Sequence, residues 1–238
     1  MTDHRKETVV GVIGAMKEEV EILKEWMDIS KTESIAHTDV YIGTLDGPQR
    51  IVLVESGIGK VNATLITSLL IDRYDVDLIV NTGVAGALSN ELDVTDMVVS
   101  TSVVHHDVDA MEFGYRFGQV PGMPAAYGAD EKLVEVAMTI LDRNKSIKCF
   151  SGLIASGDSF IADSSQKSSI IVNFSGALAV DMESASIAQT CYQFDVPFII
   201  IRSISDKADQ AADMTYEEFL KKACINSSEA VKLLLQEL

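Results

Sequence analysis

Short apolar runs alternate along this chain with longer segments in which apolar residues recur every three or four positions. The runs are rich in β-branched residues, and several are apolar at consecutive positions, which is typical of strands covered on both faces by helices. The predicted strands are Val9–Ile13, Ile51–Val54, Leu78–Val80, Met97–Val104, Leu153–Ala155, Ala177–Val180 and Val196–Ile201. The predicted helices are Met16–Met27, Lys60–Arg73, Asp130–Arg143, Glu183–Phe194 and Thr215–Leu238. This alternation predicts an α/β fold with a mostly parallel sheet in a three-layer arrangement.

Two segments add detail to the pattern. Thr215 and Glu218 have the spacing of a capping box ahead of an apolar pair, so we expect the last helix to begin at Thr215. The stretch His105–Tyr127 is aromatic and punctuated by glycine and proline, and it is long for a connection. We therefore predict a loop there that serves the functional site or contacts another subunit.

Composition narrows the class of protein. The chain has 238 residues and no linker-like tract, so we expect a single domain over residues 1–238. Lys and Arg number 19 against 36 Asp and Glu, and the net charge of -17 disfavours binding to nucleic acid or to an anionic membrane. No apolar run approaches the roughly 20 residues of a membrane span, and Met1–Thr8 lacks the apolar core of a signal peptide. These features predict a cytoplasmic protein.

The sequence gives no support to a metal or a cofactor. The three cysteines are widely spaced and lack a C-x-x-C pair, so we interpret them as small apolar side chains of the core. His105 and His106 are adjacent, and neighbouring residues on a strand point to opposite faces, so a shared metal is not expected. Gly57-Ile58-Gly59-Lys60 lacks the spacing of a phosphate-binding loop, and its glycines indicate a tight strand-to-helix turn near the site.

Glu19 is the exception on the amphipathic helix Met16–Met27. It lies three residues after Met16 and four before Leu23, so it points with the apolar stripe rather than into solvent. An ionised carboxylate there needs a partner or a function, because burying it unpaired is costly. A buried ion pair, a helix N-terminal acid and a catalytic carboxylate all remain open for this residue.

Polar residues follow two of the predicted strands. Arg202 and Asp206 follow the most apolar strand, at the carboxyl end where parallel α/β sheets bind their ligands. They are placed for binding or catalysis, or they pair with each other. Asp181 and Glu183 follow the strand Ala177–Val180, and either could instead be the acid at the N-terminus of the next helix.

Seven short motifs occur in a fixed order from Val9 to the C-terminal helix. They are Gly14-Ala15-Met16-Lys17-Glu18-Glu19, Ser56-Gly57-Ile58-Gly59-Lys60, Asn81-Thr82-Gly83-Val84-Ala85-Gly86, Phe113-Gly114-Tyr115, Ser156-Gly157-Asp158-Ser159-Phe160-Ile161, Met182-Glu183 and Arg202-Ser203-Ile204-Ser205-Asp206. Together they resemble the 5′-methylthioadenosine/S-adenosylhomocysteine nucleosidase family. The resemblance implies a nucleoside phosphorylase-like fold with a central mixed sheet, a homodimer, and hydrolysis of the substrate to adenine and a 5-thio-substituted ribose.

The resemblance also assigns chemical roles. Glu19 would be the base that activates water, and Asp206 would be the acid that protonates adenine N7, positioned by Ser205. Glu183 would hold the ribose hydroxyls, aided by Met182. Loss of adenine leaves an oxocarbenium-like ribosyl group, so an acid at the leaving base and a carboxylate near water fit this reaction. Because a direct ion pair would lower the pKa of Asp206, we expect the arginine four residues before it to be turned elsewhere, toward Glu183.

The rest of the implied site surrounds the base and the 5′ group. The backbone at Phe160 and Ile161 would read the adenine edge, and Gly86 would line the base pocket. Around the 5′-thioalkyl group, the resemblance implies Phe113, Pro121 and Tyr216, some of them across the dimer contact. It also implies substrate binding by Ile58, Tyr115 and Arg202.

Three departures from the family pattern leave alternatives open. Val84 stands where relatives often have a hydroxyl residue, Asp181 replaces a more usual Glu, and Tyr216 replaces a more usual Phe. A pocket that gains or loses one hydroxyl can shift its specificity, so a related substrate such as aminodeoxyfutalosine or 5′-deoxyadenosine remains an alternative. Two other functions also remain alternatives: a phosphate-dependent nucleoside phosphorylase and a non-catalytic nucleoside-binding protein.

Overall fold

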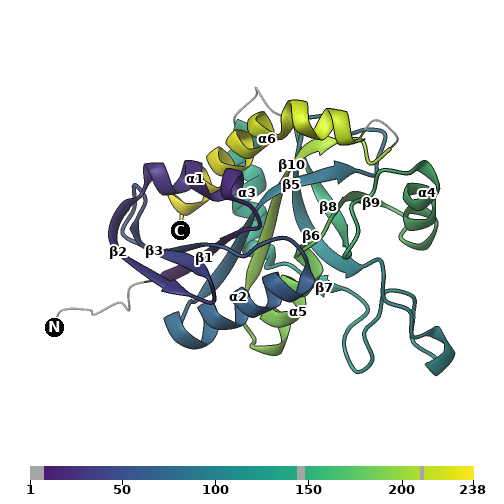
Figure 1. Ribbon diagram of the computed structural model, residues 1–238, viewed down its shortest axis with the longest axis horizontal. Helices are drawn as coiled ribbons and strands as arrows, with labels where there is room; N and C mark the ends of the chain where they lie inside the picture. Colours follow the sequence, from purple (N-terminus) through teal and green to yellow (C-terminus); the bar gives the residue numbers. More distant parts are fainter. Residues whose placement is uncertain (1–7, 144–147, 210–211) are drawn as a thin grey trace.

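A continuous β-sheet lies between two layers of helices in the computed structural model, which describes residues 8–143, 148–209 and 212–238 (Figure 1). The strands are β1 (Val9–Gly14), β2 (Asp28–Ile35), β3 (Thr38–Thr44), β4 (Arg50–Glu55), β5 (Leu78–Ala87), β6 (Met97–His105), β7 (Tyr127–Gly128), β8 (Cys149–Ser156), β9 (Ala177–Asp181) and β10 (Phe198–Asp206). The helices are α1 (Lys17–Trp26), α2 (Lys60–Tyr74), α3 (Glu131–Arg143), α4 (Ser164–Asn173), α5 (Ser184–Gln193) and α6 (Ala212–Leu235), with a 3₁₀ turn at Met111–Phe113. This arrangement confirms the predicted α/β class.

Central strands bury side chains on both faces. Along β10, Ile199 and Ile201 pack with α1, α3 and α6, whereas Ile200 and Ile204 pack into the other apolar cluster, with α2 and α5. Figure 1 shows these two helix groups above and below the sheet. Because successive side chains of a strand point to opposite faces, both faces need apolar residues, which explains the uninterrupted apolar run.

The sheet is more mixed than the predicted mostly parallel one. Its strand order is β10-β6-β8-β9-β5-β1-β4-β3-β2, and β10 also pairs with β5. The pairings β5–β10, β10–β6, β6–β8, β8–β9 and β9–β5 therefore close into a circuit. Parallel pairing joins β1 to β4 and to β5, whereas β2, β3 and β4 form an antiparallel meander. The mixed sheet that the family resemblance implied is present.

Three local features differ from the sequence-based expectations. The hairpin β2–β3 was not predicted, because its turn uses Ala36 and His37 at positive φ instead of the usual Asn or Gly. Helix α4 was also missed, although Asp163 caps it by accepting hydrogen bonds from two backbone N–H groups. The capping box was wrong: α6 begins at Ala212, so Thr215 lies inside the helix.

The chain also carries the expected glycine turn between β4 and α2. Gly57 and Gly59 have φ angles of +82° and +98°, which L side chains rarely adopt. These conformations turn the chain directly from the strand into the helix. Of the helices that the structure describes, none combines the length and apolarity that a membrane crossing requires.

Candidate active site

A cavity of about 580 Å³ opens at the carboxyl ends of β1, β5, β9 and β10. Its walls also include the loops that precede α2 and α4, and the first turns of α6. The lining residues are Ala15, Met16, Glu19, Ile58, Val84, Ala85, Gly86, Ser159, Phe160, Ile161, Val180, Asp181, Met182, Glu183, Ser205, Asp206, Tyr216 and Glu217. The cavity thus lies at the strand ends where we expected ligand-binding groups, and the predicted residues Glu19, Glu183 and Asp206 line it.

Glu19 is buried on α1 and faces the cavity, as its helical position predicted. Its Oε2 accepts hydrogen bonds from the backbone N–H groups of Ala15 at 2.6 Å and Met16 at 3.1 Å, and Oε1 accepts one from Val84 at 3.1 Å. Burial raises the pKa of Glu19, and the positive charge of Arg202 and the three N–H donors oppose the rise. Glu19 is therefore a buried carboxylate that several groups stabilise in its charged form.

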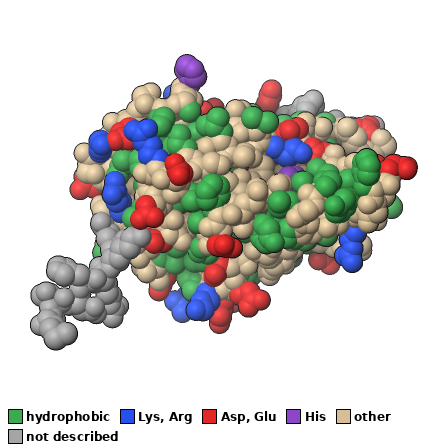
Figure 2. All heavy atoms as spheres, turned by 90° about the horizontal axis from the view of Figure 1, so that it is seen from below, with side chains coloured by type: hydrophobic (Ala, Val, Ile, Leu, Met, Phe, Trp, Pro, Cys, Tyr) green, Lys and Arg blue, Asp and Glu red, His purple; other side chains and the backbone are tan. Residues whose placement is uncertain are grey.

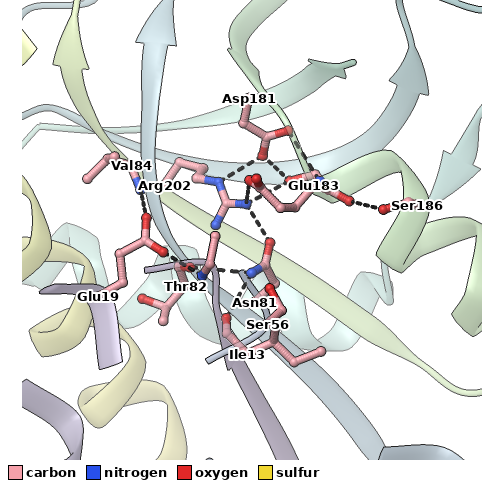
Figure 3. Close-up of polar contacts among 12 residues, drawn as sticks. Ile13, Glu19, Ser56, Asn81, Thr82, Val84, Asp181, Glu183, Ser186 and Arg202 are labelled. Atoms are coloured by element: carbon pink, nitrogen blue, oxygen red, sulfur yellow. Dashed lines mark hydrogen bonds and ion pairs between the residues drawn. The ribbon is translucent and has the colours of Figure 1, made fainter. Parts of the chain in front are cut away.

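Arg202 is completely buried beneath the cavity and is turned away from Asp206. Its Nε donates to Asp181 Oδ2 at 2.8 Å, and one Nη2 hydrogen goes to Asn81 Oδ1 at 2.5 Å. The same Nη2 lies 3.9 Å from Glu183 Oε2. Figure 3 shows the guanidinium between these groups, with Glu19 on its other side. The alternative of an Arg202–Asp206 pair was wrong, and the expected turn toward Glu183 is present, although Asp181 is the direct partner.

Asp181 and Glu183 share the entrance to α5 but differ in their contacts. Asp181 Oδ1 accepts a hydrogen bond from the backbone N–H of Ser184 at 3.2 Å, so Asp181 is the acid at the helix N-terminus. Glu183 Oε1 instead accepts one from the N–H of Gly59 at 2.9 Å. Burial and the neighbouring Asp181 raise the pKa of Glu183, while Arg202 opposes that rise. Glu183 is thus held at the cavity wall by a loop far away in sequence.

Asp206 ends β10 in a different environment. Its Oδ1 accepts a hydrogen bond from the N–H of Ala208 at 2.8 Å, and its Oδ2 accepts one from Ser205 Oγ at 2.9 Å. Burial raises the pKa of Asp206, and these two donors oppose the rise. A Cβ at Gly86 would lie 2.9 Å from Asp206 Oδ1, so glycine there leaves the carboxyl accessible from the cavity.

Aromatic side chains border the cavity beside α6. Phe160 and Tyr216 meet edge to face with ring centroids 5.7 Å apart. The Tyr216 hydroxyl lies 3.1 Å from Met16 Sδ, so this side chain of α6 contacts both Phe160 and the residue that precedes α1. Ile58, Ile161 and Met182 add apolar surface to the same cavity.

Three predicted substrate-binding residues lie away from this cavity. Phe113, Tyr115 and Pro121 belong to the segment between β6 and β7, which projects from the body at the lower right of Figure 1. Phe113 is 82% exposed, and none of the three lines the cavity of its own chain.

Two buried polar residues were missed as parts of the site. Asn81 accepts a hydrogen bond from Arg202 and donates to the carbonyl of Ile13 at 2.8 Å, so it joins the arginine to β1. Ser184 Oγ lies 3.1 Å from Arg202 Nη2. Asn81 directly follows the apolar run Leu78–Val80, and a polar side chain at that position was the signal available in the sequence.

The arrangement can supply an acid and a base to one ligand, because two buried carboxyls in unlike surroundings face the same cavity. Within the residues that the structure describes, no group of three His, Cys, Asp or Glu side chains is placed to hold a metal ion.

Comparisons with known proteins place this geometry in a family. The sequence model of the phosphorylase superfamily matches residues 9–238. A relative from Anoxybacillus flavithermus, named 5′-methylthioadenosine/S-adenosylhomocysteine nucleosidase, is 48% identical over 229 residues, which are 96% of this chain and 98% of that protein.

Solved structures agree with the sequence match. The nucleosidase of the same name from Neisseria meningitidis, in complex with methylthio-immucillin-A, has a TM-score of 0.95 and 44% identity over 97% of this chain and 100% of that one. The futalosine hydrolase of Helicobacter pylori has a TM-score of 0.93 and 33% identity over 97% and 98% of the two chains. The family that the seven motifs predicted is thereby confirmed, and the chain belongs to the 5′-methylthioadenosine/S-adenosylhomocysteine nucleosidase family within the phosphorylase superfamily.

Proposed function

We propose that this protein hydrolyses the N-glycosidic bond of 5′-methylthioadenosine and S-adenosylhomocysteine, giving adenine and a 5-thio-substituted ribose. The observation that carries the proposal is the pair Glu19 and Asp206, two buried carboxyls of raised pKa in one cavity. Glu183 lies in the same cavity, where its carboxylate suits the ribose hydroxyls. Membership of the 5′-methylthioadenosine/S-adenosylhomocysteine nucleosidase family also supports the proposal.

The reaction needs one proton donated and one accepted. As the C1′–N9 bond breaks, its electron pair passes to adenine, and Asp206 donates a proton to N7. Water attacks C1′ from the opposite face, and Glu19 takes the proton that this water loses. The two carboxyls have unlike surroundings: three backbone N–H groups and the charge of Arg202 oppose the effect of burial on the pKa of Glu19, whereas Ser205 and the N–H of Ala208 do so for Asp206.

Glu19 and Arg202 both approach the backbone at Gly83. A Cβ at Gly83 would lie 2.4 Å from Glu19 Oε1 and 2.9 Å from Arg202 Nη1, so glycine is what allows both side chains to come this near. Arg202 Nη1 is buried and has no hydrogen-bond partner among the described residues. A water that bridged the two side chains would accept from Nη1 and donate to Glu19, which would fix its orientation.

The other lining residues fit the parts of the nucleoside. Glu183 and Met182 would bind the ribose, Gly86 and the backbone at Phe160 and Ile161 would contact adenine, and Ser205 would orient Asp206. The groups proposed for the 5′-thioalkyl side are Ile58 and Tyr216 of the same chain, with Phe113, Tyr115 and Pro121 of a second copy.

Phosphorolysis is a poorer fit to the charges of the site. Of the lining residues, four are Asp or Glu besides the mouth residue Glu217, and none is Lys or Arg in the part of the chain that the structure describes. Arg202, a buried cation below the cavity, already faces Asp181, Glu183 and Glu19. A phosphate ion would be repelled by these carboxylates.

A related substrate is the second candidate. The similarity to a futalosine hydrolase favours testing aminodeoxyfutalosine, and the hydroxyl of Tyr216 at the cavity gives a polar group that could change 5′ preference. Comparing kcat/KM for methylthioadenosine, adenosylhomocysteine, 5′-deoxyadenosine and aminodeoxyfutalosine ranks these substrates.

A homodimer is proposed from one apolar face of the molecule. Helices α2 and α5 pack side by side, and Figure 2 shows hydrophobic side chains recurring across the face seen from below. Exposed apolar side chains that gather on one face are typical of a protein interface. The exposed apolar residues of these helices, of the residues that flank them and of the β6–β7 segment are here called the apolar face: Ile58, Val61, Leu65, Met111, Phe113, Tyr192 and Phe194.

A cytoplasmic location is also proposed. The three cysteines are free thiols, Cys191 and Cys224 are buried, and reducing compartments keep thiols in this state. The net charge of -17 disfavours nucleic acid and anionic membranes as partners.

The purified protein should release adenine from methylthioadenosine in phosphate-free buffer, because water activated by Glu19 replaces phosphate as the nucleophile. Adenine release is followed by chromatography with and without added phosphate. An absolute requirement for phosphate would make the protein a phosphorylase, and binding without any turnover would make it a nucleoside-binding protein.

Glu19→Gln should fold normally and bind substrate, yet lose about 10² to 10⁴ in kcat, the range that a general base contributes. The amide is nearly isosteric but cannot accept the proton of water. The measurement is kcat together with the thermal midpoint of each protein. Retention of more than about a tenth of wild-type kcat would return Glu19 to a structural role.

Asp206→Asn should abolish hydrolysis of adenine nucleosides, because the amide can donate a hydrogen bond to N7 but cannot transfer a proton. A p-nitrophenyl riboside carrying the 5′-thioether has a leaving group that needs no protonation, so it should lose far less kcat/KM on the same substitution. Equal losses on both substrates would mean that Asp206 holds the site together instead of acting as its acid.

Leu65→Asp should dissociate the dimer, because it places a charge in the apolar face of α2, where Leu65 is 49% exposed. Val172→Asp on α4, at a side chain that is 80% exposed and outside that face, is the matched control and should leave the dimer intact. Light scattering at micromolar concentration gives the oligomeric state. A wild-type protein that is a fully active monomer contradicts the proposal.

A further inference from the structure

Three charged residues at the edge of the cavity form a closed set of hydrogen bonds, here called the Lys60 ring. Lys60 Nζ donates to both carboxylate oxygens of Asp107, at 2.7 and 2.8 Å. Asp107 Oδ2 accepts a hydrogen bond from the backbone N–H of Asp158 at 2.9 Å. Asp158 Oδ1 in turn accepts one from the backbone N–H of Lys60 at 2.7 Å. The ring therefore joins the start of α2, the segment after β6 and the loop between β8 and α4.

Ile58 and Ser159, which lie close to the ring in sequence, line the cavity, whereas the ring residues do not. Ile58 and Gly59 precede Lys60, and the N–H of Gly59 holds Glu183 Oε1 at 2.9 Å. The wall segment 159–161 directly follows Asp158. The ring thus connects the loop that holds the Glu183 carboxylate to the loop that forms the opposite part of the wall.

The joined loops approach so closely that two of the contacts need glycine. A Cβ at Gly59 would lie 3.1 Å from Asp158 Oδ1. A Cβ at Gly157 would lie 2.9 Å from Asp107 Cγ and 2.6 Å from His106 Nε2. Because these atoms leave so little room, a small movement of one loop must displace the other while the ring is closed.

The ion pair in the ring is partly shielded from water. The side chains of Lys60 and Asp107 are 20% and 26% exposed. Burial favours the neutral form of Asp107, but the Lys60 ammonium and the Asp158 N–H outweigh it and hold the pKa of Asp107 below its usual range. The pair is therefore charged near neutral pH, and its two-oxygen contact is stronger than a solvent-exposed pair.

We propose that Lys60, Asp107 and Asp158 are positioning residues that fix the 159–161 wall relative to Glu183 before substrate arrives. This inference rests on the proposed function, because it takes that wall and Glu183 as the binding surfaces for adenine and ribose. Opening the ring lets the two loops move independently, so binding must order them and substrate affinity falls. Glu19 and Asp206 lie on α1 and β10, outside the ring, so the chemical step is preserved once substrate is bound.

The test compares Lys60→Met, Asp107→Asn, the double variant and Lys60→Arg with the wild type. KM for methylthioadenosine and the Kd of adenine should each rise about tenfold in both single variants, with kcat changed by less than about threefold. The double variant should be no weaker than either single one, because each opens the same ring. Lys60→Arg keeps a two-oxygen ion pair and should restore most of the affinity.

Lys232→Met is the matched control, since Lys232 pairs with Asp46 at 2.8 Å far from the cavity lining. It should leave KM and Kd unchanged. The proposal is overturned if both single ring variants stay within about twofold of wild type in KM and Kd, if Lys232→Met raises them equally, or if the double variant shows additive losses. Should the wild type release no adenine, the proposed function fails, and adenine affinity across the same variants still decides the role of the ring.

Discussion

The buried charge of Arg202 is the constraint on which the site depends. A guanidinium cannot give up its proton in a protein, so its burial beneath the cavity requires carboxylates nearby. Asp181 provides the direct ion pair, and Glu19 and Glu183 contribute through their charge. Asn81 ties the same guanidinium to β1 through the carbonyl of Ile13. The arginine thus fixes acids from α1, β9 and the start of α5 around one point at the carboxyl end of β10.

The same arrangement explains how two acids in one cavity can act differently. Arg202 directs its charge toward Glu19 and away from Asp206, and three backbone N–H groups add to the stabilisation of the Glu19 anion. Asp206 has only Ser205 and one backbone N–H as donors, and both are neutral. Burial raises the pKa of both groups, and different partners oppose that rise, so the two carboxyls sit in unlike surroundings within one cavity.

Much of this could be predicted from the sequence, because the signals were local. Apolar runs and helical periodicity gave most elements, and Glu19 stood out as a carboxylate on an apolar stripe. The family followed from ordered motifs, and the comparisons confirm it. The hairpin β2–β3 was missed because Ala36 and His37 adopt positive φ angles in its turn, which these residue types rarely do.

Apart from the turn of Arg202 toward Glu183, the partners at long range could not be predicted. Asp181 meets Arg202 across 21 positions, and Gly59 meets Glu183 across 124, so these contacts exist only once the sheet has formed. The roles of Phe113, Tyr115 and Pro121 depend on a second chain, and they stay predictions.

A site built from buried acids lowers the stability of the protein that carries it. Glu19, Glu183 and Asp206 all have folded-state pKa values above those of the unfolded chain, so the native state binds protons more tightly. Their linked stabilisation is present at low pH and is lost as pH rises from the unfolded toward the folded pKa values. At neutral pH the folded protein therefore keeps carboxyls in surroundings that disfavour their charge, and the well-packed sheet core and Arg202 offset this cost. In the proposed reaction, the oxocarbenium-like ribosyl group would place positive charge beside these carboxylates and offset part of that cost, so stability given up at the site becomes affinity for the reacting state.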